Sequence, residues 1–206
     1  MTHDSRQDAQ HWDEMYRSRD QVFSGNPNGV LVTEAADLPP GRALDVGCGE
    51  GADALWLARR GWHVTAVDIS EVALRRAAAA AADVQDRVSF TRADLLTTPP
   101  RAGAFDLVSV QYFPLTRRSG HAALRGLLDA VAPGGTLLLA THALADLARH
   151  QPEGFDPDDY YWLDDIAPLL GPDWDILVDE TRPRVAPPPA GTHHARDSVL
   201  RARRLP

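Results

Sequence analysis

The sequence predicts an α/β fold: a doubly wound, mostly parallel sheet with helices on both faces. Three observations predict it. Five short apolar runs alternate with helical patterns, a glycine cluster follows the first run, and the tail holds two apolar runs with no helix between them. Short connections between successive βα repeats place the strands parallel and the helices on both faces. The tail instead favours an antiparallel pair.

The first two repeats carry the clearest local signals. The segment RALDVG (residues 42–47) is an apolar run that ends at glycine, and the helical stripe that follows it stops at Gly61. The second run, WHVTAVD (residues 62–68), leads to Ser70, a good helix N-cap, and to a run of alanine, the best helix former. We therefore expect two strands that alternate with two helices in this part of the chain.

The later elements follow from the same periodicities and from breaks that are rich in proline and glycine. An amphipathic helix is expected to end at Pro133-Gly134-Gly135, and the proline-stiffened loop VAPPPAG is expected to join the last two strands. Strands are predicted over residues 42–47, 62–68, 87–94, 104–113, 136–142, 173–184 and 192–204. Helices are predicted over residues 51–61, 70–86 and 117–132.

Length and composition bound the class of protein. With 206 residues and 44% hydrophobic content, the chain suits one globular domain. Its formal net charge of -8 would repel a phosphate backbone and an anionic membrane, so neither nucleic acid nor a membrane is an expected partner. The polar start, the lack of an apolar run of about 18 residues and the single cysteine, Cys48, favour a cytoplasmic protein without disulfides.

Two further absences exclude particular chemistries. All 21 basic residues are arginine, so mechanisms that need lysine are excluded, among them the phosphate-loop lysine, Schiff-base catalysis and the Tyr-x-x-x-Lys pair of reductases. The eight histidines form no H-x-x-x-H or H-E-x-x-H pattern, so no metal site is expected.

The glycine cluster and two aspartates predict a nucleoside site. In a doubly wound sheet, ligands bind at the carboxyl ends of the strands near the switch point, where the first strand normally lies. Gly47, Gly49 and Gly51 fall in the turn that leaves this strand, where bare backbone lets a ligand approach closely. Asp68 closes the neighbouring strand, where a carboxylate is able to accept both hydroxyls of a ribose. A nucleoside is thus the expected ligand.

The spacing favours one nucleoside cofactor over another. Nicotinamide cofactors use G-x-G-x-x-G with a pyrophosphate at the helix N-terminus, whereas this chain has G-x-G-x-G preceded by Asp45. A carboxylate beside a pyrophosphate is repulsive, but beside an ammonium group it is favourable. S-adenosylmethionine carries such an ammonium group together with a ribose and adenine. An NAD(P)-dependent oxidoreductase and a non-catalytic nucleoside-binding module remain as alternatives.

The chain also resembles the class I S-adenosylmethionine-dependent methyltransferases, from about Trp12 to the C-terminus. The resemblance rests on five motifs in the family's order: LDVGCGEG, VTAVDIS, RADLL, FDLVSVQYF and APGGTLLL. It implies a Rossmann-like sheet of seven strands whose last strand is antiparallel and inserted as a hairpin. Residues 1–40 would form an N-terminal helix and a loop that covers the cofactor, and residues 41–206 the catalytic part.

The resemblance also implies a role for each residue that matches a motif. Asp45, Gly47, Cys48 and Gly49 would surround the methionine end of S-adenosylmethionine, and Asp68 would hold the ribose. Ile69 would pack on the adenine, Asp94 and Leu95 would lie at the adenine edge, and Gln111 would line the mouth where cofactor meets acceptor. The alternative for Asp94 is an ordinary turn aspartate, and Cys48 is expected to contribute only its backbone and its small size.

The N-terminal segment (residues 11–31) resembles a subgroup of small methyltransferases that includes thiopurine and tellurite-resistance enzymes. In that subgroup a leading helix and an aromatic loop fold over the cofactor, which makes Tyr16 and Phe23 the candidates for a lid. A plain surface helix is the alternative. A lid would exclude water from the reacting sulfonium.

In the tail, two histidines are adjacent, and neighbouring residues of a strand face opposite sides. At most one of His193 and His194 could therefore face the cleft. His194 is the candidate catalytic proton acceptor, with Asp197 close enough to orient it, and two solvent-facing histidines are the alternative.

These inferences converge on methyl transfer from S-adenosylmethionine to a small-molecule acceptor through O, N, S or a chalcogen atom, with S-adenosylhomocysteine as product. The segment QYFPLT after the fourth strand is apolar and uncharged, which favours a flat or apolar acceptor without naming one. The sequence leaves the oligomeric state open.

Overall fold

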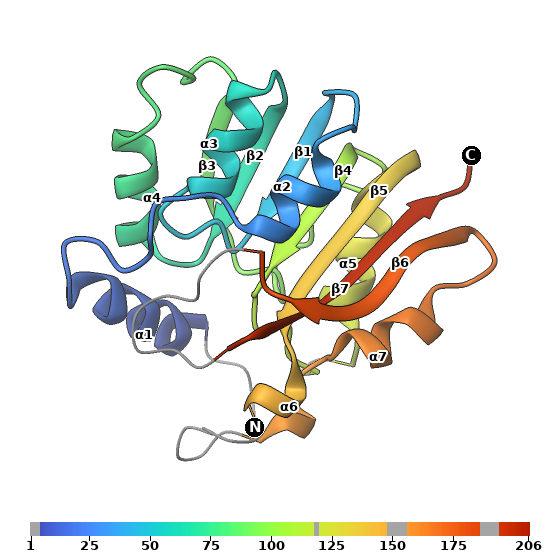
Figure 1. Ribbon diagram of the computed structural model, residues 1–206. Coiled ribbons are helices and arrows are strands. Elements are labelled where there is room, and N and C mark those ends of the chain that lie inside the picture. Colours follow the sequence, from blue (N-terminus) through green and yellow to red (C-terminus); the bar gives the residue numbers. More distant parts are fainter. Residues whose placement is uncertain (1–4, 118–119, 148–155, 186–193) are drawn as a thin grey trace.

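The computed structural model describes residues 5–117, 120–147, 156–185 and 194–206 (Figure 1). Its strands are β1 (Arg42–Val46), β2 (His63–Asp68), β3 (Val88–Arg92), β4 (Phe105–Gln111), β5 (Val131–His142), β6 (Trp174–Pro183) and β7 (Arg196–Arg204). Its α-helices are α1 (Ser5–Arg17), α2 (Gly29–Ala35), α3 (Ala52–Arg59), α4 (Glu71–Ala79), α5 (Ala122–Ala130), α6 (Leu144–Leu147) and α7 (Leu163–Ile166). Two 3-10 turns, η1 (Pro157–Asp159) and η2 (Ala167–Leu169), flank α7. None of the described helices is long and apolar enough to cross a bilayer.

The seven strands form a single sheet in the order β3-β2-β1-β4-β5-β7-β6. The first five strands are parallel, while β7 is antiparallel to both β5 and β6. The chain order reverses between β1 and β4, which is the switch point where the ligands of such sheets bind. The predicted fold class and the antiparallel C-terminal hairpin are confirmed.

The two faces of the sheet bury separate cores, as the alternation along each strand requires. Leu107 and Leu138 face the layer of α2, α3 and α4, and the neighbouring Val108 and Leu137 face α5 and α7. All four of these side chains are fully buried. Strands that are apolar on both faces are typical of a parallel sheet covered by helices on both sides.

Several predicted boundaries were wrong, among them the start of β5, which is Val131 instead of residue 136. The helix predicted over 70–86 begins as expected, with the Ser70 hydroxyl accepting from Ala73 N, but ends at Ala79 because the chain must turn to start β3. The helix predicted over 117–132 is only α5, since backbone pairing of Val131 with Phe105 already starts β5. β7 begins at Arg196 instead of residue 192.

Several short elements carry no clear sequence signal. The sequence did not predict α2, α6 or α7, which have only 7, 4 and 4 residues. Helices this short are not stable alone and form because they pack against the sheet. α2, for example, contacts β5 and β7, and its Val30 and Leu31 are fully buried.

Gly51 is expected to be far less tolerant of a side chain than Gly61, although both have a positive φ (87° and 94°). A Cβ on Gly51 would lie 2.8 Å from the Cβ of Ala77, whereas at Gly61 the nearest atom is 3.6 Å away. Gly61→Ala should therefore cost only the left-handed backbone penalty of about 1–2 kcal/mol. Gly51→Ala should cost an additional 1–3 kcal/mol or so for overpacking. Urea unfolding of both variants measures the difference, and equal losses would contradict this account.

Candidate active site

The glycine turn after β1 brings bare backbone to the switch point. Gly47, Gly49 and Gly51 all have a positive φ (66°, 53° and 87°), so the turn winds tightly from β1 into α3. Cys48 N donates to Val67 O of β2 at 3.0 Å, which fixes the turn to the neighbouring strand. A Cβ on Gly47 would lie 2.5 Å from the ring of Phe113, so only glycine allows this approach.

Asp68 lies at the end of β2 and faces this turn. One carboxylate oxygen accepts from Gly49 N at 2.9 Å and the other from Ser70 N at 2.8 Å. Burial raises the pKa of Asp68, although these backbone hydrogen bonds oppose the rise. Asp68 therefore holds the glycine turn in place and also lines the adjoining cavity.

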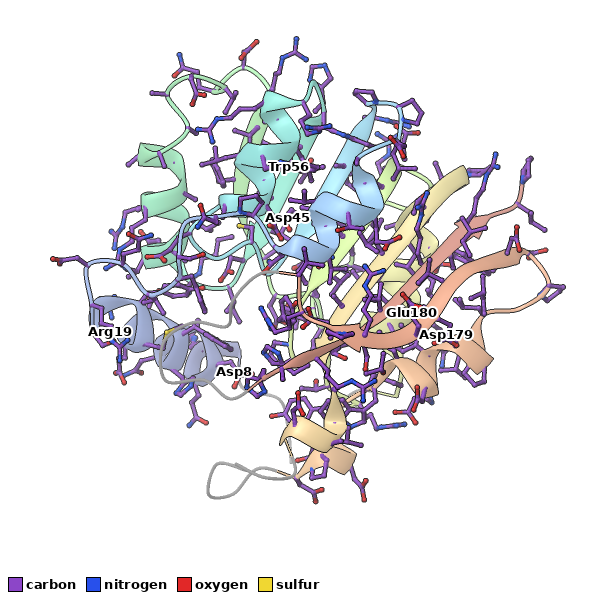
Figure 2. All side chains as sticks on the ribbon, in the orientation of Figure 1. Asp8, Arg19, Asp45, Trp56, Asp179 and Glu180 are labelled. Carbon is purple, nitrogen blue, oxygen red and sulfur yellow. The ribbon has the colours of Figure 1, made fainter. Side chains whose placement is uncertain are left out.

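Two buried acceptor atoms face the same cavity without a donor among the described residues: Asp45 Oδ2 and Gln111 Oε1. Gln111 donates through its Nε2 to the Ser109 hydroxyl at 3.1 Å, which leaves its oxygen available. Burial, followed by the charges of Asp53 and Asp68, raises the pKa of the Asp45 carboxyl well above its usual range. Figure 2 shows Asp45 in the middle of the molecule, whereas Asp8 lies on α1 at the edge of the molecule. Two unpaired acceptors in one place are complementary to a cationic group such as an ammonium ion.

Asp53, in the first turn of α3, is a site residue that the sequence reasoning missed. Its two oxygens accept from the backbone N and the side-chain Nδ2 of Asn28, at 2.7 and 2.8 Å. Both residues line the cavity. The sequence signal for Asp53 is an acidic residue in the first helical turn after the glycines. No local pattern reveals its partner Asn28, which lies 25 residues earlier in the chain.

The N-terminal segment covers the glycine turn. Tyr16 is buried, and its hydroxyl would lie 2.8 Å from a Cβ placed on Gly49. Tyr16 packs edge-on against Phe23, with ring centroids 6.1 Å apart. Burial and then the charge of Asp68 raise the pKa of the Tyr16 phenol, which therefore stays protonated. α1 packs on α4, and the role of this segment as a lid stays a prediction.

Acidic side chains fasten this segment to the parallel part of the sheet. Glu50 accepts from the backbone N of Val22 and Phe23 at 3.1 and 3.0 Å and pairs with Arg76 at 2.9 Å. On α1, Asp13 accepts from the Ser70 hydroxyl at 2.6 Å. Polar contacts of Glu50 and Asp13, together with apolar packing of Tyr16 and its neighbours against Val72 and Ala73, hold this segment over the site.

Glu50→Ala is expected to loosen the cover. The amides of Val22 and Phe23 would lose their acceptor, so their hydrogen exchange should accelerate. The affinity for S-adenosylhomocysteine should fall about tenfold, because ordering one or two backbone residues on binding costs about 1–2 kcal/mol each. Glu71→Ala is the matched control, since Glu71 is exposed and only pairs with Arg75 and Arg92. Unchanged exchange at residues 22–23 in the Glu50 variant would contradict the fastening role.

The predicted cofactor residues line two adjoining cavities. The first, of about 290 Å³, contains Asp45, Gly47, Cys48, Gly49, Asp68, Ile69, Gln111 and Tyr16 among its lining residues. The second, of about 480 Å³, is lined by Asp94 and Leu95 and shares Gly47, Asp68, Ile69 and Phe113 with the first. The structure thus brings all the predicted cofactor residues to one continuous region.

Two of these residues also fit their plainer interpretations. Asp94 Oδ1 accepts from Leu96 N at 2.9 Å, which is the turn-forming role of aspartate, and Asp94 still borders the second cavity. Cys48 is buried, and burial raises the pKa of its thiol, so a protonated, unreactive side chain is expected there.

On the far side of the first cavity lies a stack of rings. His142, at the end of β5, lies between Tyr112 and His194, with ring centroids 4.6 and 3.8 Å away. Arg184 donates to His142 Nδ1 at 3.3 Å and to Asp197 at 3.1 Å. His142 and Arg184 line the cavity, and neither was predicted from the sequence.

His194 does not lie in a strand, because β7 begins at Arg196. The orientation predicted for His194 from strand alternation is therefore wrong. His193 lies outside the described residues. The ring of His194 stacks on His142, and His142 is the histidine that lines the two cavities on this side. The catalytic role of His194 stays a prediction.

Residues 43–135 match the family model described as a methyltransferase domain. An uncharacterized methyltransferase of Mycobacterium tuberculosis is 42% identical over 130 residues, which cover 62% of this chain and 64% of that protein. Trans-aconitate 2-methyltransferase of Streptomyces coelicolor is 32% identical over 180 residues, which cover 82% of this chain and 57% of the relative. The chain therefore spans somewhat less than two thirds of the length of these curated relatives.

A similar solved structure comes from work on the conversion of a disulfide bond into a thioacetal group during echinomycin biosynthesis. Its TM-score is 0.73 at 24% identity, and the match covers 96% of this chain and 91% of the other. This likeness concerns the fold. The family model and the relatives show that this chain contains a methyltransferase domain, and the glycine turn, the two aspartates and the seven-stranded order agree with the resemblance to the class I S-adenosylmethionine-dependent methyltransferases.

Proposed function

We propose that this protein transfers a methyl group from S-adenosylmethionine to a small-molecule acceptor. The observation that carries the proposal is the pair of buried acceptors, Asp45 Oδ2 and Gln111 Oε1, in the cavity at the glycine turn. They fit the ammonium group of the methionine end. Asp68 would accept the ribose hydroxyls, and Ile69, Asp94 and Leu95 would border the adenine.

When bound, the cofactor supplies a methyl carbon activated by a positive sulfur, and the carbon–sulfur bond breaks with its electron pair left on sulfur. The protein has to orient the acceptor in line with that bond and exclude water. Tyr16 and Phe23 would contribute the exclusion of water, because they already cover the glycine turn. On this proposal, residues 1–40 would act as the cofactor-covering part of one globular domain.

Both alternatives fit less well. A pyrophosphate of a nicotinamide cofactor would meet the Asp45 and Asp53 carboxylates at the glycine turn, where a phosphate needs donors. A silent nucleoside-binding module would have no use for a further cavity that adjoins the first one at His142. A small acceptor is also named for the Streptomyces relative, whose acceptor is trans-aconitate.

Calorimetric titration tests the proposal: S-adenosylhomocysteine should bind, and NAD should not. Radiolabelled methyl transfer to a panel of phenols, thiols, amines and carboxylic acids then separates an enzyme from a binding module. Binding of NAD in preference to S-adenosylhomocysteine would overturn the proposal.

A further inference from the structure

A third cavity opens beside the ring stack and has aromatic walls. Its volume is about 170 Å³, and it is lined by Tyr112, Phe113, Pro114, Leu115, Thr141, His142, Tyr160, Tyr161 and Trp162. An engineered apolar cavity of about 150 Å³ is known to hold one benzene molecule, so this volume suits a single ring. Tyr112, Phe113, Pro114 and His142 also line the cavity at the glycine turn, so the two spaces adjoin.

The walls of this third cavity are preformed. Tyr161 N donates to Leu115 O at 2.8 Å, and Trp162 Nε1 donates to Pro157 O at 3.0 Å. Tyr112 has a left-handed backbone (φ 54°), a strained conformation that is concentrated at functional sites. Its ring also stacks on His142, with ring centroids 4.6 Å apart. Tyr112, Tyr161 and Trp162 are therefore held by contacts within the protein before any ligand arrives.

The contacts of His142 determine which proton its ring carries. An arginine is only a donor, so the hydrogen bond from Arg184 to His142 Nδ1 requires that nitrogen to be unprotonated. The neutral ring then carries its proton on Nε2. Burial, then His194 and then Arg184, lower the pKa of His142 to about 3, and the charge of Asp146 opposes this only weakly. With Nδ1 engaged by Arg184 and the ring stacked against Tyr112 and His194, Nε2–H is the polar group of the ring that is left for a ligand.

The third cavity has no described carboxylate in its lining, so its lining residues offer no base that works at neutral pH. An acceptor hydroxyl must therefore lose its proton to water before it reacts. The resulting anion would find a donor in His142 Nε2–H. The oxygen lone pair then forms the new bond to the methyl carbon as the carbon–sulfur bond breaks.

We propose that this cavity binds a methyl acceptor with one flat unsaturated ring, and that His142 selects acceptors whose reacting oxygen is an anion by donating its Nε2–H to that oxygen. The proposal rests on the proposed function, since it names the substrate class of the same site. His194 and Tyr112 act as positioning residues, because their rings hold the imidazole between them.

The test uses 4-nitrophenol as probe, with the whole protein saturated with S-adenosylhomocysteine, and follows the absorbance of the phenolate. The bound probe should ionise at least about one pH unit lower than the free probe, a tenfold preference for the anion. Nitrobenzene lacks the phenolic oxygen, and cyclohexanol lacks the flat ring. Each should bind at least about tenfold more weakly than 4-nitrophenol.

Variants assign the effect to the imidazole. His142→Ala should abolish the shift in ionisation, and His142→Gln should retain part of it, because a glutamine amide N–H reaches about as far as Nε2. His63→Ala is the matched control, an exposed histidine at the start of β2. Affinity for S-adenosylhomocysteine, measured separately, should stay within about threefold of wild type in His63→Ala, less than 1 kcal/mol, and each His142 variant is compared when saturated with that ligand.

The outcomes are distinguishable. If S-adenosylhomocysteine binds but 4-nitrophenol does not, or binds only as the neutral phenol, the inference is overturned and the proposed function stands. The same holds if His142→Ala keeps the full shift. If S-adenosylhomocysteine itself does not bind, the proposed function fails and the inference fails with it.

Discussion

Asp68→Ala is expected to weaken the binding of S-adenosylhomocysteine at least about 100-fold. Two hydrogen bonds from ribose hydroxyls to a carboxylate would be lost, each worth about 1.5–3 kcal/mol. The Asp68 carboxylate also accepts from Gly49 N and Ser70 N, so its removal additionally frees the glycine turn. Calorimetric titration gives the dissociation constant directly.

Two controls separate the loss of the ligand contact from the loss of the turn. Asp83→Ala removes an exposed aspartate that pairs with Arg59 at 2.8 Å, and it should leave the affinity unchanged. Asp68→Asn keeps an oxygen that is able to accept one backbone N–H. Its affinity for S-adenosylhomocysteine should therefore lie between those of the wild type and Asp68→Ala. An unchanged dissociation constant in Asp68→Ala would refute the ribose assignment.

Asp45→Asn is expected to change binding and stability in opposite directions. It removes the charge that would face the cofactor's ammonium group, which should weaken S-adenosylhomocysteine binding about 10- to 100-fold, or about 1.5–3 kcal/mol. In the cofactor-free protein it removes a buried carboxyl that lies beside Asp53 and Asp68. The free energy of unfolding at pH 7 should therefore rise, because burial and the charges of Asp53 and Asp68 disfavour the ionised Asp45 carboxylate but not a neutral amide.

The pH dependence of stability carries the same information. A carboxyl with a higher pKa in the folded than in the unfolded protein binds its proton more tightly when folded. The contribution of Asp45 to the free energy of unfolding is complete below its pKa in the unfolded protein, near 3.8. It is lost as the pH rises from there toward the raised pKa in the folded protein. The wild type should thus lose stability relative to Asp45→Asn across that window. Parallel stability curves from pH 3 to pH 8 would contradict the burial of an unpaired Asp45 carboxyl.

Much of the cofactor side of the site could be predicted because its residues are close in sequence. Asp45 and Asp68 end adjacent parallel strands, and the glycines follow the first of them directly, so periodicity and spacing suffice. Asp53 escaped prediction because its partner, Asn28, is the N-cap of a helix of seven residues that forms only by packing against the sheet. Helix ends were missed for a related reason: the alanine run favours a longer helix, but β3 has to begin where it pairs with β2.

The sequence by itself determined the order of strands and helices, the glycine turn and the two aspartates, because local periodicity and backbone freedom are properties of neighbouring residues. Only the tertiary structure decided the acceptor side. His142 ends β5, Tyr112 follows β4, and Arg184 and His194 lie between β6 and β7 in the C-terminal hairpin. They meet because backbone pairing sets His142 opposite Asp197. That register is fixed by long-range hydrogen bonds and by burial of both faces of the sheet, and neither leaves a pattern within any one segment.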